Sequence, residues 1–519
     1  MSKGVGIWRA LDRARAMNLK ANGEALARLG GDGITRRRVL AGLAGGAGAL
    51  LLPRAPAFGQ TPPRIAIVGG GLAGLSALDT LASRGVAATL HEARGAVGGR
   101  TRSVRGVFAP DYAFDEGGQL VNSDHADMIR LIRRFGIRMV DRKAFGPTHE
   151  VQIGRDSAPV EEADLARALR GIAAEITRDS DRLDRDYEAV AREIDAMSVA
   201  DYLDRRELPA GDARDAIEAG IRTEYGAEPR DASALELLFN LPTVDGARVT
   251  RVSLSDERYV ISGGSDQIAG ALGRLYEGAI RLNRRLTRLD VSGPEVRLAF
   301  ADGEEVRADR VILALPAPLI REVEIDGPLP PLWRDLIGEI ELGRNEKLVV
   351  GYETQPWRDS LGYGGALWAG QPFAAGWDAA SFAPAEGQGA GAICYFLGGD
   401  QVAAAAASNT ADLAARFSDA ARRAIPALPQ PIGIVRRTRW CDDPLTKGAY
   451  INFRPGQITR FGSLMTVEEE QRVRASGADP LFFAGEWLSD AWPGYMNGAV
   501  QTGRVAAEAA LAPAWAETM

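Results

Sequence analysis

The chain has 519 residues, of which 46% are hydrophobic and 25% are charged. This balance is typical of globular proteins and excludes a disordered or collagen-like chain. The formal net charge is −7, and residues 1–57 hold ten Lys and Arg against three Asp and Glu, so the rest of the chain carries −14. An acidic protein of this kind is a poor candidate for binding nucleic acid.

The first 57 residues have the pattern of an export signal. Arg36 and Arg37 precede an apolar run from Val39 to Leu52, and Ala-Pro-Ala follows at 55–57. A basic segment, an apolar segment and a small-residue site in this order predict a signal peptide, here with an unusually long leader. The paired arginines resemble the twin-arginine type and so predict a periplasmic location. The run is shorter than the ~20 residues of a membrane-spanning helix, so no stable membrane span is expected.

The next segment, residues 65–92, predicts a strand, a tight turn, a helix and a second strand. Gly69, Gly71 and Gly74 form a Gly-x-Gly-x-x-Gly turn, and the second strand ends at Glu92. In dinucleotide-binding units the first glycine permits the turn, the second lets the backbone approach a pyrophosphate, and the third packs helix on strand. We expect the helix N-terminus to bind the pyrophosphate and Glu92 to bind the adenosine ribose.

A second glycine-arginine turn follows in "GGRT" at 98–101, and "EGGQLV" follows at 116–121. Arg100 there predicts a second contact with the pyrophosphate of a longer cofactor that crosses the sheet edge. The run from Gly69 to Arg100, "EGGQ", and "FAGE" with "PGYMNGAV" near the end of the chain resemble the flavin-containing amine oxidases, which include monoamine and polyamine oxidases. Weaker similarity in "ISGGSDQIAGAL" and "ADRVILALPAPL" extends the resemblance over most of residues 64–510.

The middle of the chain predicts both helices and strands. Residues 155–240 are rich in charge, with apolar side chains at helical spacing, which predicts helices with one apolar stripe. Core packing or a dimer seam explains this stripe better than a ligand does, and a homodimer is left open. Residues 279–315 read as strands joined by glycine turns. Residues 326–470 mix strands, such as "EKLVVGYE" and "GAICYFLG", with a helix through the alanine-rich run 402–425.

The chain has two cysteines, Cys394 and Cys441, and three histidines. An oxidising compartment would permit one disulfide between the two cysteines. Cys394 lies in an apolar strand pattern, however, which favours a buried free thiol. The cysteines and histidines lack the spacing of metal ligands, so no metal is expected.

The resemblance implies an α/β fold with a discontinuous, Rossmann-like FAD-binding domain of the glutathione reductase type and an interleaved α+β substrate-binding domain. We place the FAD-binding domain at residues 58–145, 250–325 and 470–512, and the substrate-binding domain at 146–249 and 326–469. The resemblance also implies that FAD is bound by the following residues: Gly69, Gly71, Ala73, Gly74, Glu92, Arg94, Gly99, Arg100, Gly118, Gln119, Leu120, Leu286, Gly485, Glu486, Tyr495 and Met496.

The same resemblance implies three catalytic residues. Tyr450 and Tyr495 match the aromatic pair that flanks the substrate nitrogen, and Lys347 matches a lysine that reaches flavin N5 through a water. Ala449 stands where some relatives attach the flavin through a cysteine, so FAD is expected without a covalent link. Gln119 stands near the position at which amino-acid oxidases bind a carboxylate with an arginine. This difference disfavours an α-amino acid, although an arginine from elsewhere would serve instead.

These observations predict FAD-dependent oxidation of an amine to an imine by hydride transfer to flavin N5, followed by hydrolysis of the imine. The expected partners are a small-molecule amine and either oxygen or a periplasmic electron-transfer protein. Two alternatives stay open: a flavin desaturase or monooxygenase that acts on a carbon substrate, and a non-enzymatic FAD-binding module. The lack of a second Gly-x-Gly-x-x-Gly motif disfavours an NADPH-dependent monooxygenase.

Overall fold

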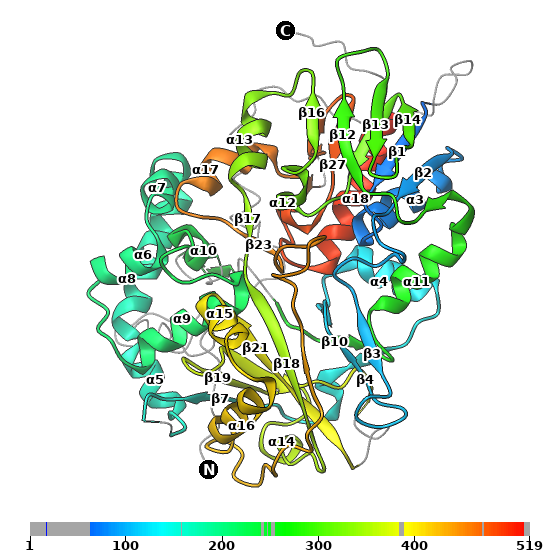
Figure 1. Ribbon diagram of the computed structural model, residues 1–519. Helices are drawn as coiled ribbons and strands as arrows, with labels where there is room; N and C mark the ends of the chain where they lie inside the picture. Colours follow the sequence, from blue (N-terminus) through cyan, green and yellow to red (C-terminus); the bar gives the residue numbers. More distant parts are fainter. Residues whose placement is uncertain are drawn as a thin grey trace.

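The computed structural model describes Met17 and residues 63–156, 158–239, 243–245, 248–250, 255–383, 389–469 and 472–512. Apart from Met17, the predicted export signal lies outside these ranges. Within them, every helix is too short or too polar to cross a bilayer. Figure 1 shows two large β-sheets, one in the upper half of the molecule and one in the lower half, with a group of helices beside the lower sheet.

The upper sheet has six strands in the order β11-β2-β1-β15-β27-β26. Neighbouring strands pair in parallel, except that β26 and β27 are antiparallel. Parallel strands end at a common edge of a sheet, so the turns after β1, β2 and β15 meet there. The strands come from three distant parts of the chain: β1 (Ile65–Val68), β2 (Ala88–His91), β11 (Ile280–Arg281), β15 (Arg310–Leu313), β26 (Gly477–Ala478) and β27 (Leu481–Phe483).

One face of this sheet packs on α3 (Leu72–Ser83) and α18 (Met496–Leu511). The two helices approach closely at Gly503, where an added Cβ would lie 2.0 Å from the carbonyl oxygen of Ala73. The last described helix therefore lies against the first helix of the sheet, and a side chain larger than glycine at this position would separate them.

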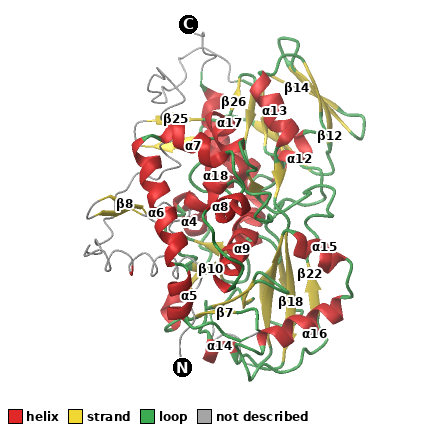
Figure 2. Ribbon diagram, turned by 90° about the vertical axis from the view of Figure 1, so that its left-hand side faces the viewer, coloured by secondary structure: helices red, strands yellow, loops and turns green. Residues whose placement is uncertain are grey.

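The opposite face is covered by a four-stranded sheet in the order β14-β13-β12-β16 and by two helices, all in one hydrophobic cluster with β1 and β15. Figure 2 shows this layer at the top of the molecule. Its elements are β12 (Leu286–Asp290), β13 (Val296–Phe300), β14 (Glu305–Ala308), β16 (Glu324–Asp326), α12 (Ala317–Ile320) and α13 (Pro331–Glu339).

The lower sheet also has six strands, in the order β22-β18-β21-β20-β19-β7. Two helices cover one of its sides, α15 (Asp400–Ala406) and α16 (Thr410–Ala421). The prediction of one helix through 402–425 is wrong, because Asn409 accepts a hydrogen bond from the Ala411 amide at 2.8 Å and so starts a new helix. The strands are β7 (Glu150–Ile153), β18 (Asn345–Tyr352), β19 (Ala366–Ala369), β20 (Ala375–Asp378), β21 (Gly391–Gly398) and β22 (Val435–Arg437).

The helices beside the lower sheet are α5 (Glu162–Ala168), α6 (Arg170–Arg185), α7 (Tyr187–Asp195), α8 (Val199–Arg205), α9 (Asp212–Tyr225) and α10 (Ala234–Phe239). The apolar stripe of this region is buried within the chain itself, which supports core packing rather than a dimer seam. Its buried members are Leu165, Leu169, Ile172, Ile176, Leu183, Val190, Ile194 and Met197.

Smaller elements join the halves, among them a three-stranded sheet in the order β5-β10-β6. Cys394 is buried in β21, and neither it nor Cys441 forms a disulfide. The other strands and α-helices are β3 (Ser103–Arg105), β4 (Ala113–Asp115), β5 (Leu120–Val121), α4 (Ala126–Arg134), β6 (Met139–Asp141), β8 (Thr243–Asp245), β9 (Arg248–Thr250), β10 (Tyr259–Ile261), α11 (Asp266–Leu275), β17 (Glu341–Leu342), α14 (Trp357–Ser360), β23 (Ile451–Asn452), α17 (Gln457–Phe461), β24 (Val467–Glu469) and β25 (Arg472–Arg474).

Candidate active site

A cavity of about 680 Å³ runs from the carboxyl edge of the upper sheet to the lower sheet. Its upper end is lined by the turn at 69–73, and its lower end by Trp368, Trp377 and Phe396 of the lower sheet. Every residue that the sequence predicts for the site lines this cavity, except Gly74. The fold therefore brings together residues that are more than 400 positions apart in the chain.

The three glycines after β1 have three different environments. Gly69 has φ +108°, and an added Cβ would lie 2.3 Å from the carbonyl oxygen of Ala314. A Cβ on Gly74 would lie 1.9 Å from the carbonyl oxygen of Gly69. Gly71 faces open space, with no described heavy atom within 4 Å of an added Cβ, and it begins α3 without a side-chain cap. The cavity thus meets bare backbone at a helix N-terminus, an arrangement that fits a pyrophosphate.

Glu92 follows β2 and is held by two backbone amides. Its Oε2 accepts a hydrogen bond from Gly70 N at 2.6 Å, and its Oε1 accepts one from Arg94 N at 2.7 Å. Burial raises the pKa of this carboxyl group, and the two amides oppose that shift. Each carboxylate oxygen keeps a lone pair that can accept from a ribose hydroxyl group. Arg94 itself donates to Asp443 at 2.7 Å, which ties the loop before Tyr450 to the upper sheet.

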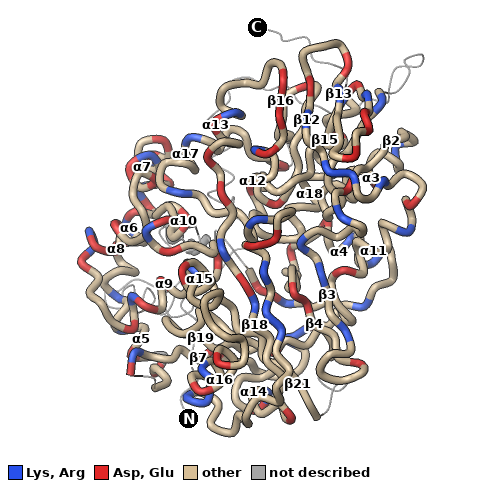
Figure 3. Tube along the Cα trace, viewed as in Figure 1, with Lys and Arg blue, Asp and Glu red and all other residues tan. Residues whose placement is uncertain are grey.

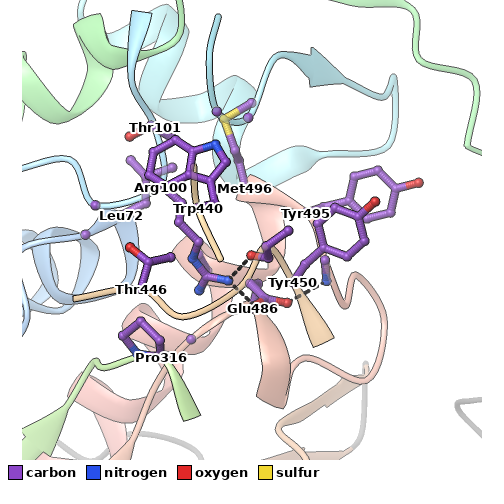
Figure 4. A pocket seen from close by; sticks show the side chains of 18 of the residues that line it. Leu72, Arg100, Thr101, Pro316, Trp440, Thr446, Tyr450, Glu486, Tyr495 and Met496 are labelled. Carbon is purple, nitrogen blue, oxygen red and sulfur yellow. Dashed lines mark hydrogen bonds and ion pairs between the residues drawn. The ribbon is translucent and has the colours of Figure 1, made fainter. Parts of the chain in front are cut away.

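Arg100 and Glu486 bind each other, an interaction that the sequence does not predict. Arg100 Nη1 donates to Glu486 Oε1 at 2.7 Å and also to the carbonyl oxygen of Ala449 (Figure 4). Glu486 Oε2 accepts from Gly494 N at 2.8 Å. The Glu486 side chain is 7% exposed and that of Arg100 is 24% exposed, so the ion pair is largely shielded from water. The ion pair joins the glycine-arginine turn at 98–101 to the aromatic turn at 492–495.

Tyr450 and Tyr495 both line the cavity and lie next to each other in Figure 4. The Tyr450 hydroxyl donates to the carbonyl oxygen of Thr223, and the Tyr495 hydroxyl donates to Ser255 Oγ at 2.9 Å. Burial, with a further contribution from Glu224, raises the pKa of both phenols well above the ordinary value for tyrosine. Both rings therefore stay neutral, and their electron-rich faces can contact a cation or an amine.

Lys347 points from β18 to the segment before β5 and is 6% exposed, so it is not a surface lysine. Its Nζ donates to the carbonyl oxygens of Asp115 at 2.9 Å and Gly117 at 2.8 Å. The ammonium group lies 6.0 Å from the centre of the Trp377 ring. Two carbonyl dipoles thus hold a positive charge at the cavity wall.

A group of glutamates at the lower end of the cavity is not predicted by the sequence. One of them, Glu150, accepts a hydrogen bond from Trp368 Nε1 at 3.1 Å. Figure 3 shows that charged residues of both signs are otherwise spread over the trace. Arg142 also lines this end, but its Nη1 donates to the carbonyl oxygen of Glu257 at 2.9 Å and lies 3.9 Å from Glu257 Oε2. The Glu257 side chain is 47% exposed, and partial desolvation at the cavity wall raises its pKa while Arg142 opposes that shift. The members are Glu150, Glu224, Glu236 and Glu257.

Strand register places several aromatic residues that sequence patterns do not single out. Phe396 of β21 pairs with Lys347 of β18, and Trp377 of β20 donates from Nε1 to Gln119 Oε1 at 3.2 Å. The period of two in "EKLVVGYE" and "GAICYFLG" predicts which side chains share a face. It does not predict which strands are neighbours. In the described part of the chain, no group of three or more His, Cys, Asp or Glu is placed to hold a metal.

Comparison with known proteins finds similarity to flavin-containing amine oxidases. The family model described as "Flavin containing amine oxidoreductase" matches residues 72–511. A flavin-containing amine oxidase of Danio rerio is 25% identical over 466 residues, covering 85% of this chain and 84% of the relative. A putative flavin-containing monoamine oxidase of Mycobacterium tuberculosis is 27% identical over 471 residues, covering 86% of this chain and 96% of the relative.

Solved structures share the fold. A putrescine oxidase variant superposes with a TM-score of 0.73 at 21% identity, over 87% of this chain and 99% of the other. Cyclohexylamine oxidase from Brevibacterium oxydans gives a TM-score of 0.72 at 22% identity, over the same shares of the two chains. The mixed α/β architecture is therefore that of known amine oxidases.

Proposed function

Because this chain belongs to the flavin-containing amine oxidoreductase family, we propose that it oxidises a small amine to an imine, which water then hydrolyses. The enzyme uses FAD, and the upper half of the molecule is proposed to bind it as a Rossmann-like domain. The observation that carries the proposal is the single cavity, which joins the open backbone at Gly71 to Tyr450 and Tyr495. The sixteen predicted cofactor residues and their roles stay predictions.

FAD, when bound, supplies an acceptor for the hydride that leaves the carbon beside the amine nitrogen. The residues of this chain orient the amine and exclude water. Tyr450 and Tyr495 hold the amine between two neutral rings in a site of low dielectric constant. Such a site favours the neutral form of the amine, which is the form that can lose a hydride.

The glutamates at the lower end of the cavity support an amine rather than an α-amino acid. Carboxylates attract a protonated amine into the cavity and disfavour a substrate carboxylate. Arg142, the arginine that lines this end, already contacts the backbone and carboxylate of Glu257. We therefore propose a cationic amine as the species that enters.

We propose that FAD is held without a covalent link. Ala449 lines the cavity directly before Tyr450, and its methyl side chain offers no atom for a bond to the flavin. Retention then depends on the glycine turn and on the polar contacts around Arg100. We also propose that the enzyme is exported to the periplasm through residues 1–57 and is reoxidised there by oxygen or an electron-transfer protein.

An anaerobic absorbance titration of the purified flavoprotein tests the reaction. Monoamines, diamines, polyamines, cyclic amines and amino acids are added in turn. Loss of the oxidised-flavin band with one class of amine is the expected result, and readmission of air then shows whether oxygen accepts the electrons. A band that no amine bleaches would refute amine oxidation and favour the desaturase or the non-enzymatic module.

Replacing Tyr450 by alanine should lower kcat/KM for the amine while the flavin content stays unchanged. A ring over a cation contributes about 0.5–2 kcal/mol, so a loss of about two- to thirtyfold is expected. Tyr450→Phe removes only the hydroxyl bonded to Thr223 and should lose less. The control is Tyr276→Phe, because Tyr276 binds Asp79 and does not line the cavity. Equal kcat/KM in Tyr450→Ala and wild type would refute the role of the ring.

Replacing Lys347 by methionine should slow anaerobic flavin reduction by at least about tenfold. Methionine keeps an unbranched side chain that is one atom shorter, and it removes the positive charge from the cavity wall and the donor to Asp115 and Gly117. A tenfold loss corresponds to about 1.4 kcal/mol, the scale of one charge-assisted hydrogen bond. Lys143→Met, on the surface, is the control. Stopped-flow reduction at the wild-type rate in Lys347→Met would contradict the assignment.

A further inference from the structure

His91, the last residue of β2, is a buried polar side chain that lacks a hydrogen-bond partner. It is 2% exposed, it lines the cavity, and neither ring nitrogen has a partner among the described residues. One face of the ring stacks on Phe300, with the ring centroids 4.6 Å apart and an interplanar angle of 28°. Apolar packing thus fixes the plane of the imidazole ring at the cavity wall.

Burial lowers the pKa of His91 to about 4, so the ring is neutral near pH 7. A neutral imidazole has one N–H donor and one nitrogen acceptor. Leaving a buried polar group without a partner costs about 1–3 kcal/mol. A polar group from outside the protein is therefore expected beside His91 in the working enzyme.

The position of His91 indicates which part of the cofactor supplies that group. Glu92, the next residue, is the predicted ribose ligand. Phe300, on which the His91 ring stacks, pairs across the strands with Leu286, one of the predicted FAD-binding residues. His91 therefore lies beside the predicted ribose ligand, at the end of the cavity where the adenosine is expected.

We propose that His91 binds the adenosine part of FAD through hydrogen bonds to its ring nitrogens, so that FAD and ADP gain affinity from this side chain and FMN does not. FMN lacks the adenosine and so offers no hydrogen-bond partner to the ring nitrogens of His91. The inference uses the flavin site of the proposed function but not the oxidation of an amine. An enzyme that binds FAD through His91 and oxidises no amine would refute the proposed function alone.

The test measures the Kd of ligands for the apoprotein by calorimetry. The variant His91→Phe keeps a ring against Phe300 and removes both nitrogens, and His91→Asn keeps one donor and one acceptor at smaller size. The probes are FAD, ADP, which carries the adenosine without a flavin, and FMN. The matched control is His149→Phe, because His149 does not line the cavity.

His91→Phe should raise the Kd values of both FAD and ADP about tenfold and change the Kd of FMN less than twofold. His91→Asn should raise the Kd values of FAD and ADP less than His91→Phe does. Unchanged Kd values for FAD and ADP would overturn the proposal, since a trapped water would then suffice for the ring. Equal losses for all three probes would also overturn it, because the effect would not depend on adenosine. If His91→Phe does not fold, the same comparison in His91→Asn decides.

Discussion

Replacing Gly71 by valine should abolish retention of FAD during purification while the apoprotein stays folded. An added Cβ at this position meets no described heavy atom within 4 Å, and φ is −74°, so the fold tolerates a side chain. The branched side chain would, however, fill the space in front of α3 and separate the pyrophosphate from the helix N-terminus. Hydrogen bonds to a charged group contribute about 1.5–3 kcal/mol each, so loss of two lowers affinity by at least about 100-fold.

The measurement is the flavin-to-protein ratio together with the thermal unfolding midpoint of the apoprotein. Gly74→Val is the contrasting variant, because its Cβ would lie 1.9 Å from a backbone oxygen and should destabilise the apoprotein itself. Gly338→Val, on an exposed position of α13 with open space around its Cβ, is the neutral control. A Gly71→Val protein that keeps a full complement of FAD would show that the cofactor does not approach this turn.

Much of the upper sheet was predictable from short-range patterns. The strand, glycine turn and helix at 65–83 follow from residue type alone, since only glycine tolerates φ +108° at Gly69 and the contact between Gly74 and Gly69. The family resemblance added the long-range information that Tyr450 and Tyr495 share one cavity. Local periodicity does not contain that information, because both residues lie in irregular segments.

The interactions that the sequence left unpredicted are those between distant segments. The partners of Lys347 are backbone carbonyls more than 200 positions earlier, and any residue type supplies a carbonyl. The unpaired state of His91 is likewise set by what surrounds it after folding. The break in the alanine-rich run was local, however, and the N-cap signal of Asn409 was visible in the sequence.

Replacing Glu486 by leucine should cause a large loss of stability. The leucine side chain is close in size but leaves Arg100 without its carboxylate and Gly494 N without its acceptor. Removing one partner of a buried ion pair costs about 3–5 kcal/mol. The aromatic turn that carries Tyr495 would lose its anchor, so kcat/KM for the amine should fall together with the urea midpoint of unfolding.

Two further variants separate the charge of Glu486 from its geometry. Glu486→Gln keeps an oxygen for Gly494 N and loses only the charge that faces Arg100, so its stability should fall between those of wild type and Glu486→Leu. Glu508→Leu, on α18, removes a half-exposed carboxylate that lies 3.3 Å from Arg84, and such surface pairs contribute at most about 1 kcal/mol. If Glu486→Leu unfolds at the same urea concentration as Glu508→Leu, the ion pair does not hold the two turns together. Apolar packing around Trp487 and Leu488, which are fully buried in the same segment, would then hold Tyr495 in position and keep the FAD site intact.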